Sequence, residues 1–120
     1  MLFRSEPGAR VYFLSGGSEA NETAIKMARQ YWAAHGRESK HMVVSRRQSY
    51  HGNTLGALSV TGHLRRRAPY LRLLQEWPRI DPCYAYRYRE PEEGEAEYAR
   101  RSAAQLEAII REKGAENIAA

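Results

Sequence analysis

The chain has 120 residues, 42% of them hydrophobic and 28% charged, a length and composition that allow one folded domain and exclude a disordered chain. The net charge of +5, carried mainly by arginine, leaves anionic ligands open, whereas no run approaches the roughly 20 apolar residues of a membrane span, which excludes a membrane protein. The single cysteine, Cys83, excludes an internal disulfide, and since the first residues lack the apolar stretch of a secretion signal, we expect a cytoplasmic location.

The N-terminal third is predicted to form a strand, a turn, a helix and a second strand. Residues 11–14 are apolar and β-favouring, as in a strand buried on both faces, and a run of glycine and serine ends it. Apolar residues at helical spacing predict a helix over residues 20–34, with a stop at residues 35–36. Residues 41–45 predict the next strand, and the helix between the two strands favours a parallel crossover.

The middle of the chain is predicted to be mostly short helices and loop. Small and apolar side chains favour a brief helix over residues 54–61. A second helical piece is expected from about residue 69 to residue 75, because Trp77-Pro78 then ends it. Residues 78–94 show no periodic pattern and are expected to be irregular.

The C-terminal part holds the clearest helix. Residues 95–113 carry an apolar stripe at helical spacing, and Gly114 stands where a C-cap glycine is expected. Residues 117–120 resemble the start of another strand, and we expect this strand to end before it can pair.

The arginines form two clusters, which are Arg65-Arg66-Arg67 and the pair Arg87 and Arg89. Such clusters can attract phosphates, and tyrosines alternate with the later pair, as they do in proteins that bind single-stranded nucleic acids. A solvated face is the more ordinary interpretation of such a run. A basic module that binds nucleic acid or another anion therefore stays as an alternative.

The turn Gly16-Gly17-Ser18 is the first candidate for chemistry. A glycine-rich turn between a strand and a helix directs backbone N–H groups and the positive end of the helix dipole to one point, which suits a bound phosphate. Ser18 can add its hydroxyl as a donor, while Gly17 lets the backbone approach the ligand without a Cβ in the way.

Nucleotide binding and serine hydrolysis are two other functions that such a turn can serve. The turn matches neither the dinucleotide pattern of spaced glycines nor the Gly-Lys-Ser/Thr ending of ATP-binding loops. It approximates the nucleophile elbow of a serine hydrolase, in which Ser18 would attack and His51 would act as the base. The chain order strains that hypothesis, because a hydrolase histidine comes late, after an acid. His51 also lacks the second ligand of a metal site, so no metal is expected.

Two longer segments resemble known signatures. FLSGGSEANETAIKMAR over residues 13–29 is similar to the segment that holds the cofactor phosphate in class III, fold-type I aminotransferases. SYHGNTLGALSVTG over residues 49–62 is similar to the next signature of that family, at the matching distance downstream. Two signatures in the correct order make a coincidence improbable.

The resemblance implies a binding site for pyridoxal phosphate. Gly17 and Ser18 match the family residues that hold the phosphate, and Tyr50 matches the aromatic residue that stacks on the pyridine ring. His51 and Gly52 match the rest of that loop, and we assign His51 to the cofactor site with them. Elementary chemistry agrees, because a dianion gains from helix-terminal amides and a pyridinium gains from an aromatic face.

The resemblance also implies a fold and a position within it. The family fold is a three-layer α/β/α arrangement with a mostly parallel sheet, and residues 1–120 match part of its large, cofactor-binding domain. The N-terminal segment, the region of the catalytic lysine and the C-terminal small domain are expected to lie outside this chain. We therefore assign no catalytic residue and expect the isolated chain to be inactive.

The function implied is transfer of an amino group from an amine or amino acid to a 2-oxo acid, by an enzyme that works as a homodimer, without nucleic acid or membrane as partner. Some relatives use the same cofactor for aminomutase or lyase chemistry, so those activities stay open. The basic module and the serine hydrolase fragment remain further alternatives.

Overall fold

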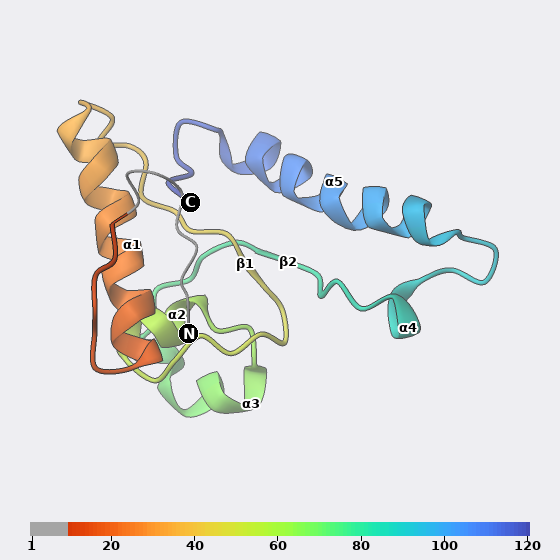
Figure 1. Cartoon of the computed structure of the whole chain (residues 1–120), viewed down its shortest axis with the longest axis horizontal. Helices are drawn as coiled ribbons and strands as arrows, with labels where there is room; N and C mark the ends of the chain where they lie inside the picture. Colours follow the sequence, from red (N-terminus) through yellow and green to blue (C-terminus); the bar gives the residue numbers. More distant parts are fainter. Residues whose placement is uncertain (1–9) are drawn as a thin grey trace.

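The computed structural model describes residues 10–120, and six helical segments surround a small parallel sheet in this part of the chain (Figure 1). The elements in chain order are α1 (Gly17–Ala34), β1 (Ser45–Arg46), α2 (Leu55–Val60), α3 (Leu64–Arg67), the 3₁₀ helix η1 (Ala68–Leu73), β2 (Arg79–Ile80), α4 (Ala85–Tyr88) and α5 (Glu95–Lys113).

The segment of residues 42–47, which contains β1, lies in the middle of the sheet. β1 pairs in parallel with β2, and Met42 forms a parallel bridge with Ile118. Within residues 42–47 the N–H groups alternate in direction: the even-numbered residues 42 and 44 donate toward residues 117–120, and the odd-numbered residues 45 and 47 donate toward residues 78–80. Since successive N–H groups of a strand point to opposite sides, the two neighbours flank this segment.

Two expectations about strands are wrong. Residues 11–14 do not form a strand: Val11, Tyr12 and Phe13 are 65%, 73% and 87% exposed, and no strand of the described residues lies beside them. β-favouring side chains do not make a strand without a neighbour that completes the hydrogen bonds. The parallel crossover between residues 11–14 and 41–45 is therefore absent, and residues 117–120, expected to end unpaired, do pair with residues 42–44.

The longer helices agree with their sequence patterns. α1 and α5 cover the predicted ranges, α2 covers most of residues 54–61, and Gly114 ends α5 with φ 81°, a conformation that favours glycine. The second helical piece begins earlier than predicted, as α3, and ends with η1. Residues 78–94 are not wholly irregular, because they contain β2 and α4, which are too short to leave a periodic pattern.

The core is small and is built around α2. The buried apolar residues of the described part are Ala57, Leu58, Val60, Ile80 and Tyr98. Within α2 the buried Ser59 hydroxyl donates to the carbonyl of Leu55 at 2.6 Å, which satisfies a polar group that would otherwise oppose burial. α1 packs against α2, so the first turn of α1 is held close to the loop that precedes α2.

Candidate functional site

The first turn of α1 presents free backbone donors. Gly16 is the N-cap residue and supplies no side-chain cap, and within the described residues the N–H groups of Gly17 and Ser18 have no partner. A Cβ placed on Gly17 would meet nothing within 4 Å, so this turn is open on that side. An 18-residue helix adds the positive end of its dipole at the same point. The turn therefore leaves two backbone donors and the positive end of the helix dipole exposed at one point.

The loop of residues 50–53 lies directly against this turn. The backbone N–H of Asn53 donates to Ser18 Oγ at 2.9 Å. Gly52 has φ 141°, and a Cβ there would stand 2.7 Å from Ser18 Oγ and 2.8 Å from Ala57 Cβ. This close approach needs glycine, both for the backbone conformation and for the space. The structure thus brings Gly17, Ser18 and the loop of the second signature together.

Asn21, in the second turn of α1, also hydrogen-bonds to the loop of residues 50–53. Its Nδ2 donates to the His51 carbonyl at 2.6 Å and to the Gly17 carbonyl at 3.1 Å. The His51 backbone N–H in turn donates to Thr61 Oγ1 at 3.0 Å. The backbone of His51 is therefore fixed from both sides.

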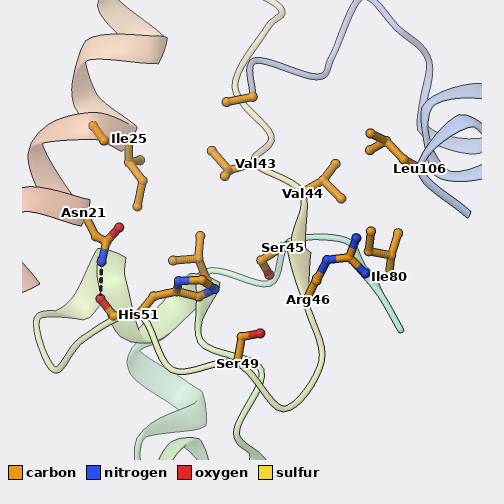
Figure 2. A pocket seen from close by; sticks show the side chains of 13 residues that line it. Asn21, Ile25, Val43, Val44, Ser45, Arg46, Ser49, His51, Ile80 and Leu106 are labelled. Atoms are coloured by element: carbon orange, nitrogen blue, oxygen red, sulfur yellow. Dashed lines mark hydrogen bonds between the residues drawn. The ribbon is translucent and has the colours of Figure 1, made fainter. Parts of the chain in front are cut away.

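The His51 ring lies at a cavity of about 510 Å³ (Figure 2). Its Nε2 is buried and has no hydrogen-bond partner among the described residues, and the same holds for the hydroxyl of Ser45. The wall is mainly aliphatic and is formed by residues of α1, of the segment 43–46 and of α2, β2 and α5. It includes Ile25, Val43, Val44, Val60, Ile80 and Leu106. Gly17, Ser18 and Tyr50 do not line this cavity, so it is distinct from the surface at the turn.

Tyr50 stands at the surface beside α3. The residue is 52% exposed, and the guanidinium carbon of Arg66 lies 4.7 Å from the ring centre. A cation at this distance over an aromatic face makes a cation–π contact. Tyr50 is thus neither a core aromatic nor an isolated surface residue.

Glu22, which belongs to the first signature, has a structural task. Its carboxylate accepts the hydroxyl of Thr54 at 2.7 Å and the N–H of Ala57 at 2.8 Å, and Gly56 donates to it at 3.3 Å. These donors lie in the first turn of α2 and its N-cap, so a residue of α1 caps α2. The sequence placed Glu22 in the motif but did not indicate this contact.

The arginine run does not form one basic face. Arg67 is only 3% exposed, and its Nη2 lies 2.5 Å from Glu76 Oε1. Burial tends to raise the pKa of Glu76, but hydrogen bonds from Arg67 and Arg79 outweigh this effect and lower the pKa. Arg67 is therefore neutralised by its ion pair with Glu76, whereas Arg87 and Arg89 are exposed.

The geometry gives no support to the serine hydrolase alternative. Within residues 10–120 no hydrogen bond joins Ser18 to the His51 ring, since Ser18 Oγ accepts from Asn53. No group of three metal-ligating side chains occurs in the same range, and none of its helices is long and apolar enough to cross a membrane.

Comparison with known proteins identifies the family. The model of the aminotransferase class-III family matches residues 1–120. The chain belongs to the class-III aminotransferases. An uncharacterized aminotransferase of Schizosaccharomyces pombe is 43% identical over 113 residues, which are 93% of this chain and 25% of that protein. The chain therefore spans about a quarter of the length of the curated relatives that it matches.

Solved transaminases share the fold of this chain. The (S)-enantioselective omega-transaminase of Thermomicrobium roseum superposes with a TM-score of 0.83 and 38% identity, over 89% of this chain and 24% of that one. A PLP-bound aminotransferase mutant from Vibrio fluvialis gives a TM-score of 0.78 and 34% identity, over 87% and 23%. These likenesses confirm the family, the α/β class and pyridoxal phosphate as the family's cofactor.

Three residues of the candidate site were missed by sequence reasoning: Asn21, Asn53 and Arg66. Both asparagines stand inside the two signatures. The polar side chain of Asn21 was an available signal, whereas Asn53 contacts Ser18 through its backbone N–H, which the identity of the side chain does not indicate. In the sequence, Arg66 is only one member of a charged run. Its contact with Tyr50 depends on the tertiary position of α3, which no local sequence pattern indicates.

Proposed function

We propose that this chain is the cofactor-holding segment of a transaminase that moves an amino group from an amine or amino acid to a 2-oxo acid. The observation that carries the proposal is the hydrogen bond from Asn53 to Ser18, with Gly52 packed against it. This contact joins the anion-accepting turn of α1 to the loop that presents Tyr50 and His51. Two segments far apart in sequence thus form one surface.

Each residue of that surface has a task in the proposal. The N–H groups of Gly17 and Ser18 bind the cofactor phosphate, and the Ser18 hydroxyl, which accepts from Asn53, still has its own hydrogen to donate. Tyr50 packs its ring against the pyridine, and His51 holds the loop in place through its backbone. Pyridoxal phosphate, when bound, supplies the electron sink that amino transfer requires.

The lysine and the acidic partner of the pyridine nitrogen are proposed to lie outside these 120 residues. Lys40 donates to the carbonyls of Ala115 and Ile118, and Lys113 pairs with Glu112, so both are engaged elsewhere. Lys26 is exposed on α1. We further propose that the active protein is a cytoplasmic homodimer, and that the isolated 120 residues are inactive.

The first experiment is to read the coding region beyond Ala120. We expect an aspartate after the strand of residues 117–120 and, farther on, a lysine in a loop. A stop codon after Ala120 would contradict amino transfer by the natural product. If both residues are present, amino donors and 2-oxo acids are then screened with added pyridoxal phosphate, and products are identified so that aminomutase or lyase activity would be recognised.

Ser18→Ala tests the phosphate contact in the intact protein. A hydrogen bond to a charged group contributes roughly 1.5–3 kcal/mol, so we expect cofactor affinity to fall by about one order of magnitude or more. Ser39→Ala is the matched control, since Ser39 donates to the Glu116 carbonyl far along the chain. Equal affinities for both variants would contradict the assignment.

Two further measurements separate the alternatives. Binding of nucleic acid weakens steeply with added salt, whereas cofactor binding in a formed pocket responds much less. A serine hydrolase would label at Ser18 with a fluorophosphonate probe, and we expect no labelling there.

A further inference from the structure

Arg66 is placed to control the orientation of the Tyr50 ring. Its guanidinium carbon lies 4.7 Å from the ring centre, so it occupies one face of the ring. We propose that Arg66 is a positioning residue: it holds the ring plane of Tyr50 and leaves the opposite face for the cofactor. This inference rests on the proposed function, because it gives Tyr50 a ligand to meet.

Helix α3, which carries Arg66, is held in place by the next residue, Arg67. Arg67 is buried and paired with Glu76, whose other carboxylate oxygen accepts from Arg79 at 3.0 Å. Arg67 is thus buried and ion-paired, whereas the preceding residue of α3, Arg66, is exposed. Because successive residues of a helix point in different directions, anchoring Arg67 also fixes the direction in which Arg66 leaves α3.

The loop that carries Tyr50 is hydrogen-bonded to Gly62, the residue before the N-cap of α3. The N–H of Gln48 donates to the Gly62 carbonyl at 3.1 Å, and the N–H of Gly62 donates to the Ser49 carbonyl at 2.8 Å. A Cβ on Gly62 would stand 2.6 Å from Arg47 Cα, so only glycine allows the two chain segments to approach this closely. These hydrogen bonds hold the segment just before Tyr50 against the segment just before α3. They therefore keep Tyr50 and Arg66 close to each other.

The contact with Arg66 limits the orientations that the Tyr50 side chain can adopt. With 52% of Tyr50 exposed, few neighbours restrict the rotation of its side chain. A cation over one face favours the rotamers that keep the contact. Without it, the ring samples more orientations, and a planar ligand must then restrict them at a cost in binding.

The test compares three variants of the intact holoenzyme. Arg66→Gln removes the cation, Arg66→Lys keeps it, and Arg65→Gln removes the same charge from a neighbouring exposed residue of α3. We expect Arg66→Gln to weaken pyridoxal phosphate binding about two- to fivefold, the equivalent of roughly 0.5–1 kcal/mol for a cation over an exposed ring. The visible circular dichroism of the bound cofactor should change with it, and Arg66→Lys should restore both in part.

A second measurement needs no cofactor. 3-Fluorotyrosine at position 50 reports the ring's surroundings through its ¹⁹F resonance, and we expect that resonance to shift in Arg66→Gln and to stay in place in Arg65→Gln. If the resonance shifts but no variant, nor the parent protein, binds the cofactor, the proposed function fails while the positioning of Tyr50 stands. An unchanged resonance, or equal losses of affinity in Arg66→Gln and Arg65→Gln, would overturn the inference.

Discussion

At the scale of single residues, the joint between α1 and the loop of residues 50–53 depends on Gly52. Its φ of 141° lies where L side chains are strained, and a Cβ would stand 2.8 Å from both Ser18 Cα and Ala57 Cβ. Ser18 therefore cannot keep its place if Gly52 gains a side chain. The proposed phosphate contact and the packing of α2 would be disturbed together.

Gly52→Ser tests this joint. We expect the free energy of unfolding of the intact protein to fall by about 1–3 kcal/mol, from backbone strain and overpacking. Gly94→Ser is the matched control: no atom lies within 4 Å of a Cβ there, and its φ of −71° at the N-cap of α5 suits serine. Denaturant unfolding measures both; a loss at residue 52 no larger than at residue 94 would show that the close approach is dispensable.

The sequence indicated some of these residues and not their partners. The turn with Gly17 and Ser18 and the loop with Tyr50 and His51 were predicted from two signatures, and the structure does bring the turn and the loop together. Their roles toward the cofactor stay predictions. The contact of Arg66 with Tyr50 depends on a fold-back of the chain, so spacing along the sequence does not reveal it.

At the scale of elements, α2 is a helix that its neighbour stabilises. It has six residues, too few to be stable alone, and its N-cap residue supplies no side-chain cap. Glu22 of α1 fills that place by accepting from Thr54 and from two backbone N–H groups. The helix that holds the core is thus capped by another helix.

We expect Glu22→Ala to lower the free energy of unfolding by about 1–3 kcal/mol, because it leaves partly buried donors without an acceptor. Glu22→Gln should cost less, since the amide oxygen still accepts. Glu107→Ala, which removes an exposed pair with Arg111, should cost under about 0.5 kcal/mol. Denaturant unfolding of the three variants ranks them, and similar losses at residues 22 and 107 would refute the cap.

The pair of Glu93 and Arg101 ties α5 to the loop before it and gives a dependence on pH. Arg101 donates to both carboxylate oxygens at 2.7 Å, and these hydrogen bonds lower the pKa of Glu93 below its ordinary value of 4.5. A lowered folded-state pKa means that the pair stabilises fully above pH 4.5 and that its contribution disappears as the pH falls through the lowered pKa.

Arg101→Gln should return the pKa of Glu93 toward its ordinary value, which NMR titration of the Glu93 carboxyl carbon measures. The stability difference between parent and variant should be constant at neutral pH and shrink in acid. Arg111→Gln should leave this titration unchanged. Identical Glu93 titrations in the parent and Arg101→Gln would rule the pair out.

The elements that the sequence predicted well are those whose signal is local. α1 and α5 are long enough for apolar residues to recur several times, and Gly114 marks the end of α5. Residues 11–14 have the composition of a buried strand, yet they stay exposed because no neighbour pairs with them within the described part. β2 has two residues, so its pairing with β1 is decided entirely by tertiary structure.

At the scale of the whole molecule, the chain leaves much of its surface uncovered. Its accessible area is 9348 Å², whereas a compact protein of 13.8 kDa exposes about 6,600 Å². Its radius of gyration is 16.5 Å, against about 13.6 Å for a compact domain of this length. Large apolar side chains such as Phe13 and Leu64 are mostly exposed.

We therefore expect the isolated 120 residues to show no cooperative thermal transition. The five buried apolar residues of the described part, residues 10–120, do not offset the conformational entropy of the chain. Differential scanning calorimetry measures this directly, with the intact protein as the control that should unfold cooperatively. A sharp transition of the isolated chain, with equal calorimetric and van't Hoff enthalpies, would contradict the expectation.

The order of neighbours in the sheet determines when the sheet can form. Residues 42–47 pair with residues 78–80 on one side and with residues 117–120 on the other. Trp32 Nε1 also donates to the carbonyl of Ala119, which is 87 residues away in sequence. Contacts so far apart in sequence are slow to close. During synthesis, α1 can form as it leaves the ribosome. The segment of residues 42–47 keeps one unpaired edge until residues 117–120 have also emerged. Chaperones can bind this exposed edge in the interval.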